Sequence, residues 1–159
     1  MLLAVRLRHL SIIVLPQKQL SHFYPRFISN YFYKTINSNY MKILMVCLGN
    51  ICRSPLAEGI MKNKIQEQQL NWEVDSAGTG AWHAGEKPDP RSIKVAQKNN
   101  IDITGQRGRQ FQADDLDEFD LVLTMDATNF QNVRRLATSS EQEDKIHLIM
   151  NFVNPGFNE

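Results

Sequence analysis

The chain has 159 residues, of which 42% are hydrophobic and 22% charged, with a formal net charge of +1. This length accommodates one globular domain, and a net charge so near zero gives no electrostatic reason to expect a nucleic-acid partner. Two cysteines are too few for a disulfide scaffold and suit a reducing compartment, so we predict a cytoplasmic protein.

Residues 1–40 differ in composition from the rest of the chain. They hold five of the 18 basic residues and none of the 17 acidic ones. The apolar run at residues 10–15 is far shorter than the ~20 residues that span a bilayer, so no membrane association is predicted. An acid-free, Arg-bearing segment is typical of transit peptides. We nevertheless interpret residues 1–40 as a basic upstream extension outside the fold, and residues 41–159 as the domain.

The first predicted strand is the apolar run at residues 43–46, which has the composition of a buried parallel strand. A helix is predicted from Pro55 to about Gln69, with Ser54 as its N-cap and Pro55 at its first position. Apolar residues recur along it at helical spacing, and we expect its other face to be exposed to solvent. That face carries Glu58, Lys62, Lys64 and Glu67.

The rest of the chain alternates between strands and helices. Strands are predicted at residues 72–76, 120–124 and 145–150, and helices at residues 91–99 and around Phe130, Val133 and Leu136. Residues 101–111 are predicted to be irregular. Strands that alternate with helices favour a parallel sheet covered on both faces.

A loop of sequence Cys-Leu-Gly-Asn-Ile-Cys-Arg-Ser-Pro, residues 47–55, connects the first strand to the first helix. Such a loop presents backbone N–H groups and the positive end of the helix dipole to an anion. These groups and the Arg53 guanidinium favour the thiolate form of Cys47, and Arg53 can hold two phosphate oxygens through its planar fork. The pattern predicts that Cys47 attacks phosphorus to give a cysteinyl-phosphate, which water hydrolyses.

The ligand predicted for this loop is phosphate or another oxyanion. The predicted phosphate-binding residues are Leu48, Gly49, Asn50, Ile51, Cys52, Arg53 and Ser54. From the residues alone, the alternative is a buried cysteine pair in a glycine-containing turn.

The loop resembles the signature of the low-molecular-weight protein tyrosine phosphatases, and the resemblance runs from Met41 to Glu159. Shorter similarities lie at residues 75–79, 89–91, 107–110 and 125–129. The resemblance implies a doubly wound α/β three-layer sandwich with a four-stranded parallel sheet, and phosphate bound at the carboxyl end of the first strand. It implies a phosphotyrosine protein substrate, with Cys47 as nucleophile, Arg53 as the clamp on the transition state, and neither metal nor cofactor.

Other residues take their predicted roles from the same resemblance. Positions like Asn50 and Ser54 brace the phosphate loop in this family, and Ser54 hydrogen-bonds the thiolate. Trp82 and His83 are predicted to form the substrate rim, with Trp82 stacking on the phosphotyrosine ring. The alternatives are a tryptophan that fills core and a histidine that is structural or simply exposed. Asp126 resembles an acid that organises nearby loops, although a helix-starting aspartate explains it equally well.

The role of Cys52 is open. It could form a disulfide with Cys47 under oxidation and so protect the nucleophile, or it could be a packed loop cysteine without a redox role.

One departure concerns the general acid, which in the family is an aspartate before a proline near the C-terminus. No aspartate follows Asp144 in this chain, and the nearest similar segment begins with Asn154, which cannot donate a proton as an acid. We therefore expect a C-terminally truncated sequence that binds phosphate but has reduced activity, because loss of a general acid costs roughly 10²–10⁴-fold in rate.

Three alternatives to a tyrosine phosphatase remain. The chain could be a catalytically impaired phosphate- or phosphotyrosine-binding module. It could be a protein arginine phosphatase, but that branch would have threonine where Ile51 stands. An arsenate reductase would need further cysteines after Cys52, and the chain has none.

Overall fold

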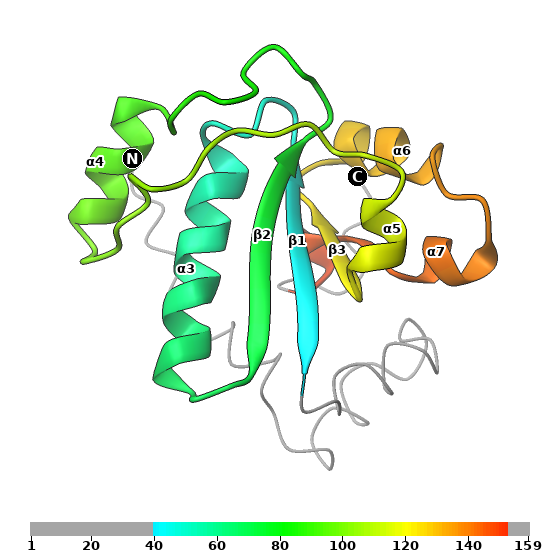
Figure 1. The fold of residues 1–159 in the computed structure, drawn as a ribbon, viewed down its shortest axis with the longest axis horizontal. Coiled ribbons are helices and arrows are strands. Elements are labelled where there is room, and N and C mark those ends of the chain that lie inside the picture. Colours follow the sequence, from blue (N-terminus) through cyan, green and yellow to red (C-terminus); the bar gives the residue numbers. More distant parts are fainter. Residues whose placement is uncertain (1–39, 153–159) are drawn as a thin grey trace.

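The computed structural model describes residues 40–152, which form one parallel four-stranded sheet flanked by helices (Figure 1). The strands are β1 (Met41–Cys47), β2 (Trp72–Gly78), β3 (Leu121–Thr124) and β4 (Ile146–Leu148), in the order β2-β1-β3-β4. The helices are α3 (Arg53–Glu67), α4 (Pro90–Gln97), α5 (Asp115–Glu118), α6 (Ala127–Arg134), α7 (Ser140–Asp144) and the 3-10 helix η2 (Ile149–Phe152). The predictions for residues 1–39 and for Asn154 fall outside the described residues.

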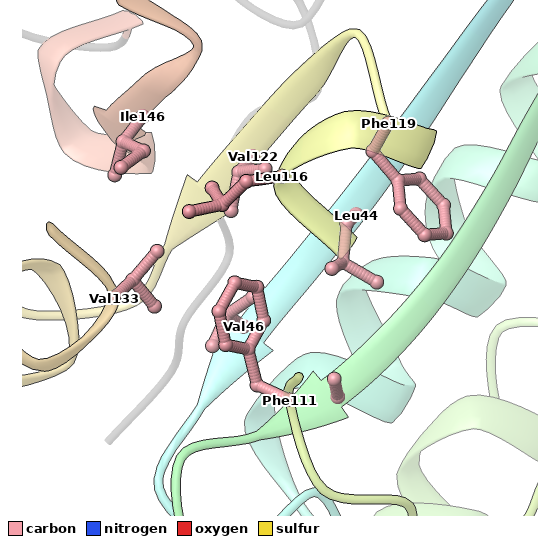
Figure 2. Packing of buried hydrophobic residues seen from close by; sticks show 9 residues of the cluster. Leu44, Val46, Phe111, Leu116, Phe119, Val122, Val133 and Ile146 are labelled. Carbon is pink, nitrogen blue, oxygen red and sulfur yellow. The ribbon is translucent and has the colours of Figure 1, made fainter. Parts of the chain in front are cut away.

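Two apolar cores cover the two faces of the sheet. On one face, Met41, Ile43 and Met45 of β1 pack with Met61 and Ile65 of α3. On the other face, alternate residues of β1 pack with residues from α5, α6 and the neighbouring strands (Figure 2). That second cluster contains Leu44, Val46, Ala77, Phe111, Leu116, Phe119, Val122, Val133 and Ile146. The predicted doubly wound, three-layer α/β fold is therefore confirmed.

The carboxyl end of β1 lies at the point where the strand order of the sheet reverses. β1 pairs with β2 on one side, with Cys47 opposite Gly78, and with β3 on the other side, with Val46 opposite Thr124. The chain leaves the carboxyl end of β1 through the loop of residues 48–52 and enters α3. Ligands of open parallel sheets bind at such a switch point, because the loops on its two sides diverge there.

Helix α3 differs from its prediction in two ways. It begins at Arg53 with Cys52 as N-cap, so the prediction that Ser54 caps it is wrong. The Ser54 side chain instead lies inside the first turn, where its hydroxyl contacts the Cys47 sulfur. The prediction that Glu58 is exposed is also wrong: only 3% of it is exposed, because it faces Ser76 of β2 and not solvent.

Smaller differences concern the second half of the chain. Residues 101–111 are irregular, as predicted, with one isolated bridge between Gly78 and Gln110. The last strand ends at Leu148, and the residues predicted to extend it form η2. Leu136 lies beyond α6 and is exposed. The short helices α5 and α7 were not predicted, since four or five residues are too few to show a helical repeat.

Candidate functional site

Cys47 is the last residue of β1 and is almost completely buried. Its Sγ lies 3.0 Å from the Ser54 hydroxyl oxygen and accepts a hydrogen bond from the Asn50 backbone N–H at 3.3 Å. A thiolate carries no hydrogen, so both groups are donors when the sulfur is ionised. Two donors are therefore placed to stabilise negative charge on this buried sulfur when it acts as a nucleophile.

Backbone hydrogen bonds fix the loop of residues 48–52 through its carbonyl groups. The Cys47, Leu48 and Ile51 carbonyls accept from the N–H groups of Thr79, Gly80 and Asp89, at 2.8–2.9 Å. Within the described part of the chain, no acceptor is paired with the N–H groups of Leu48, Gly49, Ile51, Cys52 and Arg53. Consecutive unpaired N–H groups at the start of a helix form an anion-binding loop.

Asn50 holds the loop from within. Its backbone has a φ of 53°, in the left-handed region that asparagine tolerates better than most residues. Its side-chain Oδ1 accepts from the Arg109 N–H at 2.8 Å, and its Nδ2 donates to the hydroxyls of Ser54 at 2.9 Å and Ser76 at 2.8 Å. The buried Asn50 amide therefore has a partner on both of its ends, and its orientation is fixed.

The end of β2 passes very close to the loop. A Cβ on Gly78 would lie 2.9 Å from the Leu48 carbonyl oxygen and 3.1 Å from the Asn50 nitrogen, which leaves no room for a side chain. Ser76 and Gly78 belong to the segment that resembles the family, but no role was predicted for either of them. The resemblance at residues 75–79 was the signal that could have identified them. A serine and a glycine in a strand indicate no function by themselves.

Arg53, the first residue of α3, is paired with Asp126. Its Nη1 donates to Asp126 Oδ2 at 2.5 Å, and about half of its side chain is exposed. Asp126 is also the N-cap of α6, because its Oδ1 accepts from the Asn129 N–H at 2.7 Å. Burial acts to raise the pKa of Asp126, but the hydrogen bonds from the Asn129 backbone and from Arg53 outweigh it and lower that pKa. Asp126 therefore starts α6 and also connects it, through Arg53, to the start of α3.

The two predicted rim residues lie over Gly49. A Cβ on Gly49 would be 3.1 Å from His83 Cδ2 and 3.8 Å from Trp82 Nε1. Trp82 is 63% exposed, so the alternative that it fills core is wrong. The His83 Nδ1 contacts Glu86 Oε2 at 2.9 Å, which holds the imidazole beside the loop. The structure thus brings Trp82 and His83 together at the mouth of the loop.

The remaining predictions concern cysteines, metals and membranes. Cys47 and Cys52 are both free thiols, and the redox role of Cys52 stays a prediction. Residues 40–152 contain no group of three or more His, Cys, Asp or Glu side chains placed to hold a metal ion. Among those residues there is also no helix with the length and apolar character needed to cross a membrane.

Comparisons with known proteins agree on one family. The family model described as low molecular weight phosphotyrosine protein phosphatase matches residues 42–158. A Schizosaccharomyces pombe protein of the same description is 39% identical over 119 residues, which are 73% of this chain and 75% of that protein.

Solved structures also align with this chain. The crystal structure of YfkJ from Bacillus subtilis aligns with a TM-score of 0.70 at 33% identity, covering 76% of this chain and 77% of that one. A Drosophila arginine phosphatase aligns with a TM-score of 0.64 at 35% identity, covering 68% of this chain and 70% of that one.

Proposed function

This chain belongs to the low molecular weight phosphotyrosine protein phosphatase family, and on that basis we propose that it hydrolyses phosphotyrosine in proteins through a cysteinyl-phosphate intermediate. The observation that carries the proposal is the Cys47 sulfur, which has two hydrogen-bond donors and lies at the base of a loop of unpaired N–H groups. A nucleophile and an anion site in one loop are what phosphoryl transfer to cysteine requires.

Each loop residue has a proposed role in that reaction. Cys47 attacks phosphorus, while the N–H groups of the loop and the guanidinium of Arg53 bind the equatorial oxygens as their charge develops. In the structure Arg53 Nη1 is bound to Asp126, so the remaining guanidinium donors are the ones available to phosphate. Ser54 and the Asn50 N–H stabilise Cys47 as the attacking thiolate and, later, as the leaving group.

The exposed apolar groups near the loop support an aromatic substrate. Leu48 is 44% exposed and Trp82 is 63% exposed, and both are adjacent to the anion-binding N–H groups. An aromatic ring attached to phosphate can pack between such side chains, and a tryptophan face stacks well on a phenol ring. Ile51 also favours phosphotyrosine, since the arginine phosphatase branch would have threonine there.

Protonation of the leaving group separates two kinds of ester. An ester whose leaving group departs as a stable anion needs no general acid, whereas phenyl phosphate and phosphotyrosine do, and a general acid contributes about 10²–10⁴-fold in rate.

We further propose that residues 41–159 form the phosphatase domain, with residues 1–40 as an extension, and that the protein acts in the cytoplasm. The family match from residue 42 to 158 supports the domain limits. Two free cysteines and no disulfide among the described residues fit a reducing compartment.

The test compares para-nitrophenyl phosphate, phenyl phosphate, a phosphotyrosine peptide and a phosphoarginine peptide as substrates of the wild type and of Cys47→Ser. We expect para-nitrophenyl phosphate to be cleaved much faster than phenyl phosphate, and the phosphotyrosine peptide faster than the phosphoarginine peptide. Cys47→Ser should lose at least about 10⁴-fold in kcat, the scale seen when a nucleophile is removed.

Trapping distinguishes an enzyme from a binding module. A cysteinyl-phosphate on Cys47, formed in a single turnover and mapped by mass spectrometry, is expected for the phosphatase. Tight phosphotyrosine binding with no covalent intermediate and no release of phosphate would contradict the proposal. Faster cleavage of phosphoarginine than of phosphotyrosine would move the chain to the arginine phosphatases.

A further inference from the structure

A buried chain of hydrogen bonds leads from the Cys47 sulfur to the surface of α3. Ser54 contacts the sulfur, and Asn50 Nδ2 donates to both Ser54 and Ser76. The Ser76 hydroxyl then donates to Glu58 Oε2 at 2.6 Å, and Lys62 Nζ donates to Glu58 Oε1 at 2.5 Å. Of these groups, Lys62 is the one that reaches solvent, with 56% of its side chain exposed.

The direction of each hydrogen bond in this chain is determined by two fixed ends. At the loop, the Arg109 N–H occupies Asn50 Oδ1, so Asn50 must turn its two amide hydrogens towards Ser54 and Ser76. Both serine oxygens therefore accept from Asn50, and their own hydrogens must point elsewhere.

The second fixed end is the Glu58 carboxylate, which accepts the Ser76 hydrogen. The Ser54 hydrogen has two acceptors within reach, the Cys47 sulfur at 3.0 Å and the Ala77 carbonyl oxygen at 3.5 Å. The nearer one is the nucleophile.

The ion pair with Lys62 compensates for the burial of the Glu58 carboxylate. The Glu58 side chain is only 4% exposed, and a buried charge without a partner is costly. Without the positive charge of Lys62, the Glu58 side chain is therefore favoured to turn towards water. Ser76 then loses its acceptor, and the arrangement that holds Asn50 and Ser54 in place is disturbed. The positive charge of Lys62 also interacts electrostatically with the buried hydrogen-bond network that ends at the Cys47 sulfur.

We propose that Lys62 is a positioning residue for the Cys47 nucleophile, acting through Glu58, Ser76, Asn50 and Ser54. The inference rests on the proposed phosphatase function and adds a surface group that sets how readily the sulfur reacts. A change of charge at Lys62 alters the reaction without contact with the substrate.

The test uses Lys62→Met, which keeps most of the side-chain length, and Lys62→Arg, which keeps the charge. Lys64→Met is the matched control: Lys64 lies on the same helix and pairs with Glu67 at 2.5 Å, but it has no contact with the buried chain. The first readout is the alkylation rate of Cys47 by iodoacetamide at one fixed pH, with peptide mapping to separate it from Cys52. The second is kcat and KM for para-nitrophenyl phosphate.

Lys62→Met is expected to slow alkylation of Cys47 and to lower kcat by roughly 3- to 10-fold, the effect of one weakened hydrogen bond, with KM unchanged. Lys62→Arg should restore both values, and Lys64→Met should match the wild type. Equal alkylation rates in the wild type and Lys62→Met, or the same loss in Lys64→Met, would overturn the proposal. Alkylation needs no turnover, so a wild type without esterase activity would count against the proposed function and leave this comparison intact.

Discussion

The two sides of the phosphate-binding loop differ in how they are built. The inner side, with Asn50, Ser54 and Ser76, is buried, and each of these side chains has more than one hydrogen-bond partner. On the outer side, Trp82 is exposed and His83 is half-buried, and both lie against Gly49. The Cys47 sulfur therefore lies in a fixed environment, whereas the side chains that face a substrate are held by few contacts. Changes on the inner side should alter the chemistry and the fold, and changes on the outer side should alter substrate binding alone.

Asn50→Ala tests the inner side and should have the largest effect. It removes three side-chain hydrogen bonds, leaves the Arg109 N–H and the Ser54 and Ser76 hydroxyls short of a partner, and places alanine at a φ of 53°. We expect a loss of about 2–4 kcal/mol in the free energy of unfolding, since each unpaired buried group costs about 1–3 kcal/mol. The kcat should fall at least tenfold, by roughly 1.4 kcal/mol in the barrier.

Urea unfolding and steady-state kinetics measure the two effects together. Asn50→Gly is the matched control, because glycine accepts this φ and removes the same hydrogen bonds. If Asn50→Gly were as stable and as active as the wild type, the buried network would have no part in holding the nucleophile.

Trp82→Ala tests the outer side. Because 63% of Trp82 is exposed, the free energy of unfolding should change by less than about 0.5 kcal/mol. The KM for a phosphotyrosine peptide should rise about 2- to 10-fold, the effect of losing one aromatic contact. Inhibition by inorganic phosphate, which has no ring, should be unchanged and serves as the internal control. Weaker phosphate inhibition in Trp82→Ala would show that the rim also shapes the anion site.

Asp126→Asn tests the junction between the two sides and should have the smallest effect, one that depends on pH. Asparagine can still cap α6, but it removes the charge paired with Arg53. Because the folded-state pKa of Asp126 is lowered, the unfolded chain binds its proton first as the pH falls. The stabilising contribution of Asp126 is therefore complete above its unfolded pKa of about 4 and is lost as the pH falls through the lowered value.

Urea midpoints of the wild type and Asp126→Asn across this pH range measure that contribution. The two midpoints should differ at neutral pH and converge in acid. A difference that stayed constant down to the lowest pH would show that the ion pair with Arg53 contributes nothing to stability.

The sequence by itself determined the order of the four strands and of the longer helices α3, α4 and α6, and the position of the loop. Apolar runs such as residues 43–46 identify buried strands, because a strand covered on both faces has to be apolar throughout. The loop of residues 47–55 could be found from the sequence because its functional residues are close together in the chain. A cysteine, an arginine and the start of a helix all lie within these nine residues. Trp82 and His83 were placed near it through the resemblance, and the structure brings both beside Gly49.

Only the tertiary structure decided what lies beneath the loop. Glu58 follows the spacing of a solvent-exposed helix face, yet β2 brings Ser76 against it, 18 residues away in the chain. Ser54 has the residue type and position of an N-cap, but its hydroxyl forms hydrogen bonds with Cys47 and Asn50 instead. The physical reason is the same in both cases. Local pattern reports which side of a helix is polar, whereas the partner that satisfies a buried polar group comes from another strand, and its position depends on how the sheet is assembled.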